Sequence, residues 1–240
     1  MVNKYCILLT ASIDPGNTPK VGRNDILQRE QDYIKALKFY IKSGIPVIFC
    51  ENSGYKSEEI EQLISSSDKV EYLKFKSEFS YLGKSHGEKE IFDYVYANSS
   101  YLKESEYVIK ITGRLIVKNL LKIIYKINDS KIDLFVNLVR NISCTDSRFF
   151  IFQKLFYPVY FEPSLSKYLN EPIGDGFEIC LARAYHQAMA EGKKCILLPE
   201  FPIYIGVNAW NNKQLDRGVY VKLKYKIYYY IKLYVFRQTI

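Results

Sequence analysis

The sequence predicts an α/β protein in which helices cover both faces of a mainly parallel central sheet. Short apolar runs without alternation recur along the chain, as is typical of strands that are buried on both faces. Segments with apolar residues at helical spacing lie between them, joined by short links, and this order favours a layered α/β/α arrangement. The chain has 240 residues, 48% hydrophobic and 25% charged, which is the size and composition of a globular domain.

The first half of the chain alternates regularly between strand and helix patterns. Asn24 is the expected cap of the first helix, and Gly44 is expected to follow its end. The carboxyl ends of parallel strands open onto one crevice, where such sheets bind their ligands. The predicted strands cover residues 5–10, 46–50, 70–75 and 107–111, and the further helices cover 57–66 and 88–97.

The second half has a less regular pattern. Residues 115–127 and 177–190 are predicted to be helices, and residues 133–139 and 195–198 are predicted to be strands. The strongly aromatic stretch 149–161 fits either type of element.

Charge and aromatic content narrow the class of partner. The formal net charge is +8, and 22 of the residues are Tyr, a side chain with an apolar ring and a polar tip that suits binding clefts and membrane interfaces. A surplus of positive charge predicts an anionic partner, which can be nucleic acid, phospholipid or a phosphate-bearing small molecule. Net charge does not choose among these three.

The five cysteines are interpreted as reduced core residues, because their number is odd and no Cys-x-x-Cys pattern is present. The apolar run near the start of the chain is too short for a signal peptide, and no run of 18 apolar residues occurs. We therefore expect a cytoplasmic protein.

Residues 216–240 form a basic aromatic tail that we separate from the main domain, residues 1–215. As a helix, the tail would lie on an anionic membrane surface. The alternation over residues 221–227 also fits a strand, and helix is the favoured interpretation. From Gly218 onward the tail has seven aromatic residues, no acidic residue, and the cations Lys222, Lys224, Lys226, Lys232 and Arg237.

Polar residues at the first two strand tips predict a binding site for a nucleoside. Hydroxyl, carboxylate and amide groups at adjacent tips can hydrogen-bond a base and a ribose. Such residues are also common in turns and caps, which is the alternative. Arg23, at the start of the first helix, opposes the helix dipole unless it meets an anion. The other candidates at these tips are Thr10, Asp14, Glu51, Asn52 and Ser53.

Two further segments indicate a place for phosphates. Lys84 and Gly87 lie at a predicted helix start, where backbone N–H groups and one ammonium group can hold phosphate. Lys110 and Arg114 flank Gly113 at the fourth strand tip, where they would suit a diphosphate. An ordinary strand end with solvated cations is the alternative.

Three acidic residues are candidates for acid–base chemistry. Asp175 precedes the helix predicted at residue 177, Glu178 lies in its first turn, and Asp146 precedes the aromatic stretch. Asp175 and Glu178 also suit helix capping, which carries equal weight.

In this order, these segments resemble the glycosyltransferases of bacterial surface-polysaccharide assembly, such as capsule and O-antigen, with a GT-A-like, Rossmann-type fold. The resemblance covers residues 4–210. It rests on the segments at 8–14, 23–33, 49–54, 83–88, 109–114 and 174–178.

The resemblance implies that Thr10, Asp14, Glu51 and Asn52 hold the nucleoside and that Lys84 approaches the phosphates. It also implies a general base at the start of the late helix, for which Asp175 fits best, Glu178 second and Asp146 third. Enzymes of this kind usually bind a divalent metal through Asp-x-Asp, a pattern that the chain lacks. We expect Lys110 and Arg114 to replace the metal, and no cofactor besides the donor substrate.

The leading hypothesis is therefore an enzyme that transfers a sugar from a nucleotide-sugar donor to a lipid-linked oligosaccharide, held at the inner face of the cell membrane by its tail. A nucleic-acid-binding protein is the rival class, but no helix-turn-helix, RRM or zinc pattern supports it, so nucleic acid is not expected as a partner. A nucleotide-sugar-binding protein without activity is the third alternative.

Overall fold

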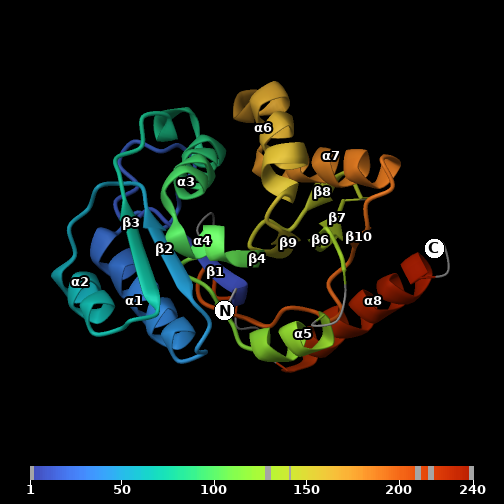
Figure 1. Cartoon of the computed structure of the whole chain (residues 1–240), viewed down its shortest axis with the longest axis horizontal. Helices are drawn as coiled ribbons and strands as arrows, with labels where there is room; N and C mark the ends of the chain where they lie inside the picture. Colours follow the sequence, from blue (N-terminus) through green and yellow to red (C-terminus); the bar gives the residue numbers. More distant parts are fainter. Residues whose placement is uncertain (1–2, 128–130, 141, 209–211, 216–218, 238–240) are drawn as a thin grey trace.

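The computed structural model of the chain describes residues 3–127, 131–140, 142–208, 212–215 and 219–237. A seven-stranded sheet runs through its centre in the order β10-β6-β9-β4-β1-β2-β3 (Figure 1). Strand β9 is antiparallel to both of its neighbours, and the other pairs are parallel. The strands are β1 (Asn3–Ala11), β2 (Val47–Glu51), β3 (Val70–Lys74), β4 (Ser105–Thr112), β6 (Leu134–Phe135), β9 (Phe149–Gln153) and β10 (Cys195–Ile196). The prediction of a mainly parallel sheet is confirmed.

Helices cover both faces of this sheet and form the three predicted layers (Figure 1). One apolar core joins the sheet to α3, α4, α6 and α7, and a second core joins the opposite face to α1, α2 and α5. The helices are α1 (Ile26–Ile41), α2 (Glu58–Ser65), α3 (Lys84–Asn98), α4 (Ser100–Glu104), α5 (Leu120–Ile127), α6 (Glu162–Tyr168), α7 (Phe177–Ala190) and α8 (Val219–Arg237). Two-stranded ribbons are formed by β5 (Ile116–Val117) with β11 (Tyr204–Ile205), and by β7 (Leu138–Val139) with β8 (Cys144–Thr145).

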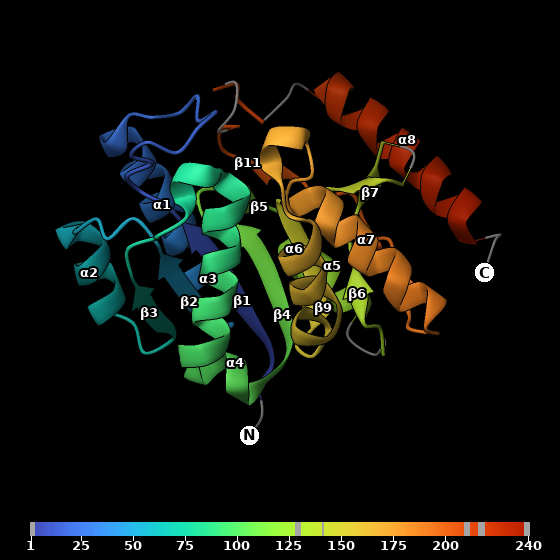
Figure 2. The ribbon, with the colours of Figure 1, turned by 90° about the horizontal axis from the view of Figure 1, so that it is seen from above.

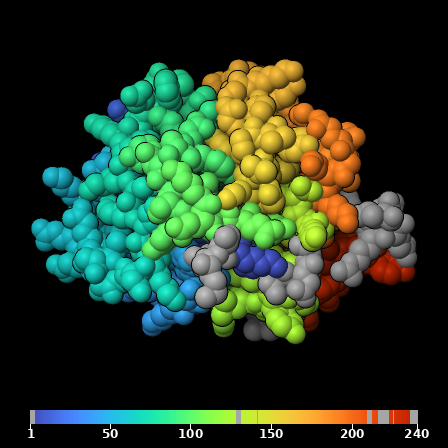
Figure 3. Space-filling view, viewed as in Figure 1, coloured from blue at the N-terminus to red at the C-terminus, as the bar shows by residue number. Residues whose placement is uncertain are grey.

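The order of the chain is visible on the surface. Figure 3 shows the first half of the chain, in blue to green, beside the later part, in yellow to orange, with α8 in red at the lower right. Figure 2 shows the carboxyl end of β4 pointing toward the edge where β5 and β11 lie. The candidate site described below lies at this edge.

Several predicted boundaries are corrected by local hydrogen bonds. Asp25, and not Asn24, caps α1, because its carboxylate accepts the N–H of Gln28 at 2.9 Å. The expected helix over 115–127 begins only at Leu120, because the carbonyl of Leu115 and the N–H of Val117 are bonded to the Tyr40 hydroxyl. The expected strand over 133–139 is divided between β6 and β7.

The aromatic stretch 149–161 is half strand and half helix. It forms β9 and then a π-helical segment, η2 (Tyr157–Phe161), which leads into α6. Phe92 of α3 stands at the centre of its packing, with rings at 5.0 to 6.3 Å on several sides. Aromatic contacts of this kind position α3 and α7 against the sheet.

The five cysteines are buried and unbridged, as expected for core residues. Burial raises the pKa of Cys6 and of Cys195 to about 12 and that of Cys180 to about 11. These thiols therefore stay protonated at neutral pH, and a thiolate nucleophile is not a candidate among them.

The tail is helical, as favoured from the sequence, although residues 216–218 and 238–240 of the predicted tail lie outside the described residues. Tyr229 fastens α8 to the body, since its side chain is buried and its hydroxyl donates to the carbonyl of Leu198 at 2.8 Å. Within the described ranges, no helix combines the length and apolar character needed to cross a bilayer.

Candidate active site

A cavity of about 360 Å³ lies where the carboxyl ends of β1, β2 and β4 meet the first turn of α3. We call it the donor cavity, after the donor substrate that the sequence predicts to bind there. Its volume falls within the range of about 300–1,000 Å³ that is usual for small-molecule sites. Of the thirteen candidate residues, seven line it: Thr10, Asn52, Lys84, Gly87, Arg114, Asp146 and Glu178.

Gly113 brings β1 and β4 close together at the base of the donor cavity. Its N–H donates to the carbonyl of Thr10 at 2.9 Å, and a Cβ at this position would stand only 2.8 Å from that oxygen. A side chain there would push against backbone, so the turn requires glycine. The turn carries the chain from β4 to Arg114, as its sequence suggested.

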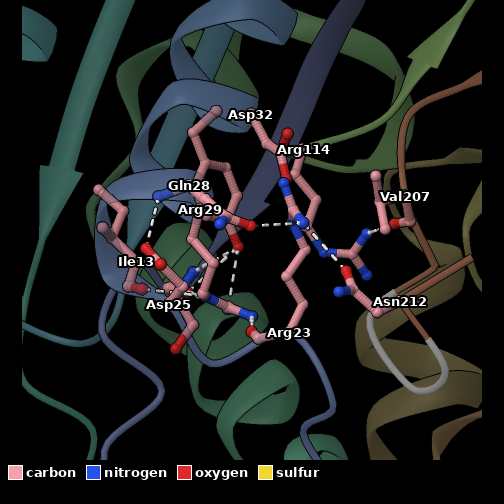
Figure 4. Close-up of polar contacts among 11 residues, drawn as sticks. Ile13, Arg23, Asp25, Gln28, Arg29, Asp32, Arg114, Val207 and Asn212 are labelled. Carbon is pink, nitrogen blue, oxygen red and sulfur yellow. Dashed lines mark hydrogen bonds and ion pairs between the residues drawn. The ribbon is translucent and has the colours of Figure 1, made fainter. Parts of the chain in front are cut away.

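Arg114 reaches the donor cavity with most of its donors available. Nη1 donates to the carbonyl of Val207 at 2.6 Å (Figure 4), and this is the one partner of its guanidinium in the described part of the chain. Burial lowers its pKa, yet a guanidinium remains charged at neutral pH. Its free N–H groups suit an anionic oxygen.

Arg29 borders the donor cavity and has a structural role. Its guanidinium is buried and donates to the carbonyls of Ser12, Ile13 and Arg23, which holds the loop after β1 (Figure 4).

Arg23 does not line the donor cavity, which corrects its assignment as an anion ligand. Its Nε contacts the carboxylate of Asp32 at 2.6 Å, and its Nη1 donates to the side-chain carbonyl of Asn212 at 2.9 Å (Figure 4). The sequence predicts an anion beside Arg23, and the carboxylate of Asp32 is that anion.

Glu51, Asp14 and Ser53 also serve the loops and do not line the cavity. The carboxylate of Glu51 is fully buried and accepts the N–H groups of Ile13, Ser53 and Gly54 at 2.9–3.0 Å, together with the hydroxyl of Ser53. Burial raises its pKa, and these hydrogen bonds oppose that shift. Asp14 accepts the N–H of Gly16 in a turn. The expected contact of Glu51 with a nucleoside is therefore corrected to support of the two tips.

Asn52 offers a hydrogen-bond acceptor in the donor cavity. Its Nδ2 donates to the carbonyl of Gly87 at 2.9 Å, which fixes the orientation of the amide. Its Oδ1 is buried and has no partner among the described residues. Because buried polar atoms are usually satisfied, this oxygen is suited to an N–H or O–H group of a ligand.

Lys84 begins α3 and borders the donor cavity with an exposed side chain. Its ammonium group has no partner in the described ranges. The next N–H along the helix, that of Ser85, donates to the carboxylate of Glu171 at 3.0 Å. A carboxylate therefore already occupies part of the helix terminus where phosphate was expected.

Lys110 lies beneath the donor cavity and not in it. Its side chain is 0% exposed, its ammonium is paired with Glu88, and it donates to the carbonyl of Ser147 at 2.6 Å. This corrects the expected contact of Lys110 with a diphosphate, because no surface of the ammonium is open to a ligand. Lys110 instead positions Glu88, which does border the cavity.

Two of the three candidate acids line the donor cavity, and Asp175 does not. Asp175 is paired with Arg183 at 2.9 Å. The carboxylate of Asp146 accepts hydrogen bonds from Nε and Nη2 of Arg148 at 2.7 and 2.6 Å. The Asp146 carboxylate more than offsets the effect of burial and raises the pKa of Arg148.

Of the two acids in the cavity, Glu178 is the one without an ion-pair partner in the described ranges. Its Oε1 accepts the Ser147 hydroxyl at 2.8 Å, and no cation is paired with it in the described ranges. It lies in the first turn of α7, so the structure favours Glu178 over Asp175 as a proton acceptor.

No group of three or more metal-ligating side chains occurs among the described residues. The expectation that fixed cations act without a metal remains a prediction, and Arg114 and Lys84 are the cations placed to fulfil it.

Known proteins resemble this chain in structure and not in sequence. No protein-family model matches the chain, and no curated protein matches its sequence. The glycosyltransferase GlyE of Streptococcus pneumoniae TIGR4 matches with a TM-score of 0.50 at 11% identity over 82% of this chain, which spans 45% of GlyE. The inositol-1-phosphate CTP transferase of T. maritima matches with a TM-score of 0.49 at 14% identity, covering 92% and 94% of the two chains. The match to GlyE shows that the chain shares the fold of the matched part of that protein.

Sequence reasoning missed Glu88, Ser147, Arg148 and Glu171, which all border the donor cavity. Glu88 lies in the segment 83–88, and Arg148 follows the candidate Asp146 by two residues. Glu171 lies far along the chain from α3. No local pattern could identify it, because its contact with the N–H of Ser85 forms only when the chain folds.

Proposed function

We propose that this protein is a glycosyltransferase that takes a sugar from a nucleotide-sugar donor and passes it to a lipid-linked acceptor in surface-polysaccharide synthesis. One observation carries the proposal: Lys84 and Arg114 share one cavity with the carboxylate of Glu178. Both cations have N–H groups without a hydrogen-bond partner in the described part of the chain. The cations suit the diphosphate of a donor, and the carboxylate suits the deprotonation of an acceptor.

In the proposed reaction, Glu178 takes the proton of an acceptor hydroxyl. The oxygen forms a bond to the anomeric carbon, and the bond from that carbon to the diphosphate breaks. The nucleoside diphosphate leaves with the electron pair, and Arg114 and Lys84 stabilise its charge. We assign the binding of the nucleoside to Asn52, whose Oδ1 has no partner among the described residues, and to Thr10, which lines the same cavity.

The membrane-surface role of residues 216–240 belongs to the same proposal, with residues 1–215 as the catalytic domain. The face of α8 turned away from Tyr229 carries Ile227, Ile231 and Tyr234, which are 53%, 57% and 65% exposed. The exposed cation Lys224 lies on the same face. An apolar face with cations is typical of helices that lie on an anionic lipid surface, and it would hold the enzyme at the cytoplasmic face near its acceptor.

A thermal-shift screen against UDP, GDP and CMP tests donor binding, because a ligand of the folded state raises its apparent stability. Hydrolysis of the corresponding nucleotide-sugars, measured with and without EDTA, tests turnover and metal dependence together. Binding without hydrolysis or transfer would mark a non-catalytic protein. Release of diphosphate from nucleoside triphosphates would mark a nucleotidyltransferase, and full loss of activity in EDTA that Mg²⁺ or Mn²⁺ restores would overturn metal independence.

A further inference from the structure

A second and larger cavity lies between α8 and the body of the protein. We call it the α8 groove. Its volume is about 1150 Å³, against 360 Å³ for the donor cavity. Asp146, Arg148 and Glu178 line both spaces. A molecule in the α8 groove therefore has access to the same carboxylate that we assign to acceptor activation.

The α8 groove has fixed walls that are largely apolar. Figure 2 shows α8 running beside β7. Lys232 of α8 donates to the carbonyl of Leu138 in β7, and the ring of Tyr229 packs edge-on against Phe201 at 5.6 Å. Apolar side chains from four parts of the chain line the space: Leu138, Ile142, Ile179, Phe201, Ile203 and Leu223.

The same groove carries cations that have no acidic partner among the described residues. Of the acids that line it, Glu200 is paired with Lys122 at 2.7 Å and with Lys126 at 2.8 Å, and Asp146 is paired with Arg148. Arg140 and Lys226 also line the groove, and the described part of the chain supplies neither side chain with a partner. Apolar walls with such cations are complementary to an anionic amphiphile, and a phosphate group is one anion that Arg and Lys bind well.

We propose that the α8 groove binds the lipid phosphate of the acceptor, with Arg140 and Lys226 on the phosphate oxygens and the apolar wall on the hydrocarbon chain. This inference rests on the proposed function and adds a subsite to it. It gives α8 a second role, because the inner face of the helix would bind a single acceptor molecule while the outer face lies on the bilayer. It also places the acceptor beside Glu178, at the wall shared with the donor cavity.

Calorimetric titration of the full chain with farnesyl diphosphate tests the proposal. We expect saturable binding that is weaker for farnesol, which lacks the phosphates, and for inorganic diphosphate, which lacks the chain. Removal of a charge-assisted hydrogen bond should weaken binding about tenfold in Arg140→Gln and in Lys226→Gln. Lys35→Gln is the matched control, because it removes the same charge from an exposed helical position that lines neither cavity. We expect it to bind as the wild type does.

Three results would overturn the proposal. The first is an absence of saturable binding by folded protein, and the second is an equal loss in Lys35→Gln and Lys226→Gln. The third is equally tight binding of a soluble short-chain phosphatidylglycerol through Arg140 and Lys226, which would assign the groove to bulk headgroups. Titration of the same samples with UDP and GDP examines the donor cavity separately. Failure to bind any nucleotide there would count against the proposed donor and not against the groove.

Discussion

The hydroxyl group of Ser147 donates a hydrogen bond of 2.8 Å to Oε1 of Glu178. The carbonyl of the same serine accepts from the buried ammonium of Lys110 at 2.6 Å. Thr145, two residues earlier, donates through its hydroxyl to the carbonyl of Glu178 at 2.9 Å. The segment between β8 and β9 thus orients the Glu178 carboxylate, and Lys110 holds that segment from below.

Glu178→Gln should lower turnover by about 10²–10⁴ while donor affinity stays nearly constant, because the variant removes the proton acceptor but keeps the shape of the side chain. Single-turnover kinetics and donor titration separate the two effects. Asp175→Asn is the matched control, since Asp175 is paired with Arg183 outside the donor cavity. A loss of turnover in Asp175→Asn with normal turnover in Glu178→Gln would restore the order of preference that the sequence suggested.

Lys110→Met should destabilise the fold by about 3 kcal/mol, because loss of one partner leaves Glu88 as an uncompensated charge in a largely buried position. Urea unfolding measures the free energy of unfolding of each variant. The double variant Lys110→Met/Glu88→Gln should cost less than the sum of the two single variants, since it removes both charges. Additive costs would show that the pair does not act as a unit.

The membrane-surface role of α8 predicts a specific loss. Ile231→Glu should weaken binding to vesicles that contain phosphatidylglycerol by about tenfold or more, because full burial of such a side chain contributes about 1.5–3 kcal/mol. Leu27→Glu is the matched control, as Leu27 is 69% exposed at the start of α1, away from α8. Co-sedimentation measures both. Equal losses would indicate a general effect of charge, and no loss in Ile231→Glu would remove α8 as the contact.

The elements with strong periodicity and clear ends could be predicted from the sequence, and α7 is the best example, since the expected range 177–190 is the observed one. The contacts of the polar side chains could not be predicted from the sequence. Lys110 occupies a strand tip, as expected, yet the packing of α3 across β4 buries it against Glu88. Glu51 likewise follows its strand as expected, but its carboxylate turns toward backbone N–H groups that only the folded loops bring together.

The buried carboxylate of Glu51 should make stability depend on pH in a defined direction. Burial raises its pKa above the usual 4.5. The folded state therefore binds this proton more tightly than the unfolded state does. The resulting stability is fully present below pH 4.5 and is lost as the pH rises through the folded pKa. Glu51→Gln should destabilise the protein by about 1–3 kcal/mol, because one of the two acceptor oxygens becomes an NH₂ group that cannot accept a backbone N–H. The difference from the wild type should shrink between pH 4.5 and pH 7.5.

Glu59→Gln supplies a control of opposite sign. Glu59 is exposed, and its hydrogen bonds with Lys38 and Gln31 lower its pKa below 4.5. Its contribution is therefore present above pH 4.5 and is lost as the pH falls through the folded pKa. Urea unfolding of the wild type and both variants, between pH 4.5 and pH 7.5 for Glu51 and below pH 4.5 for Glu59, compares differences, in which the other titrating groups cancel. A Glu51→Gln difference that grows toward pH 7.5 would show that the hydrogen bonds of the two strand tips outweigh burial, and that Glu51 is held there as a stabilised anion.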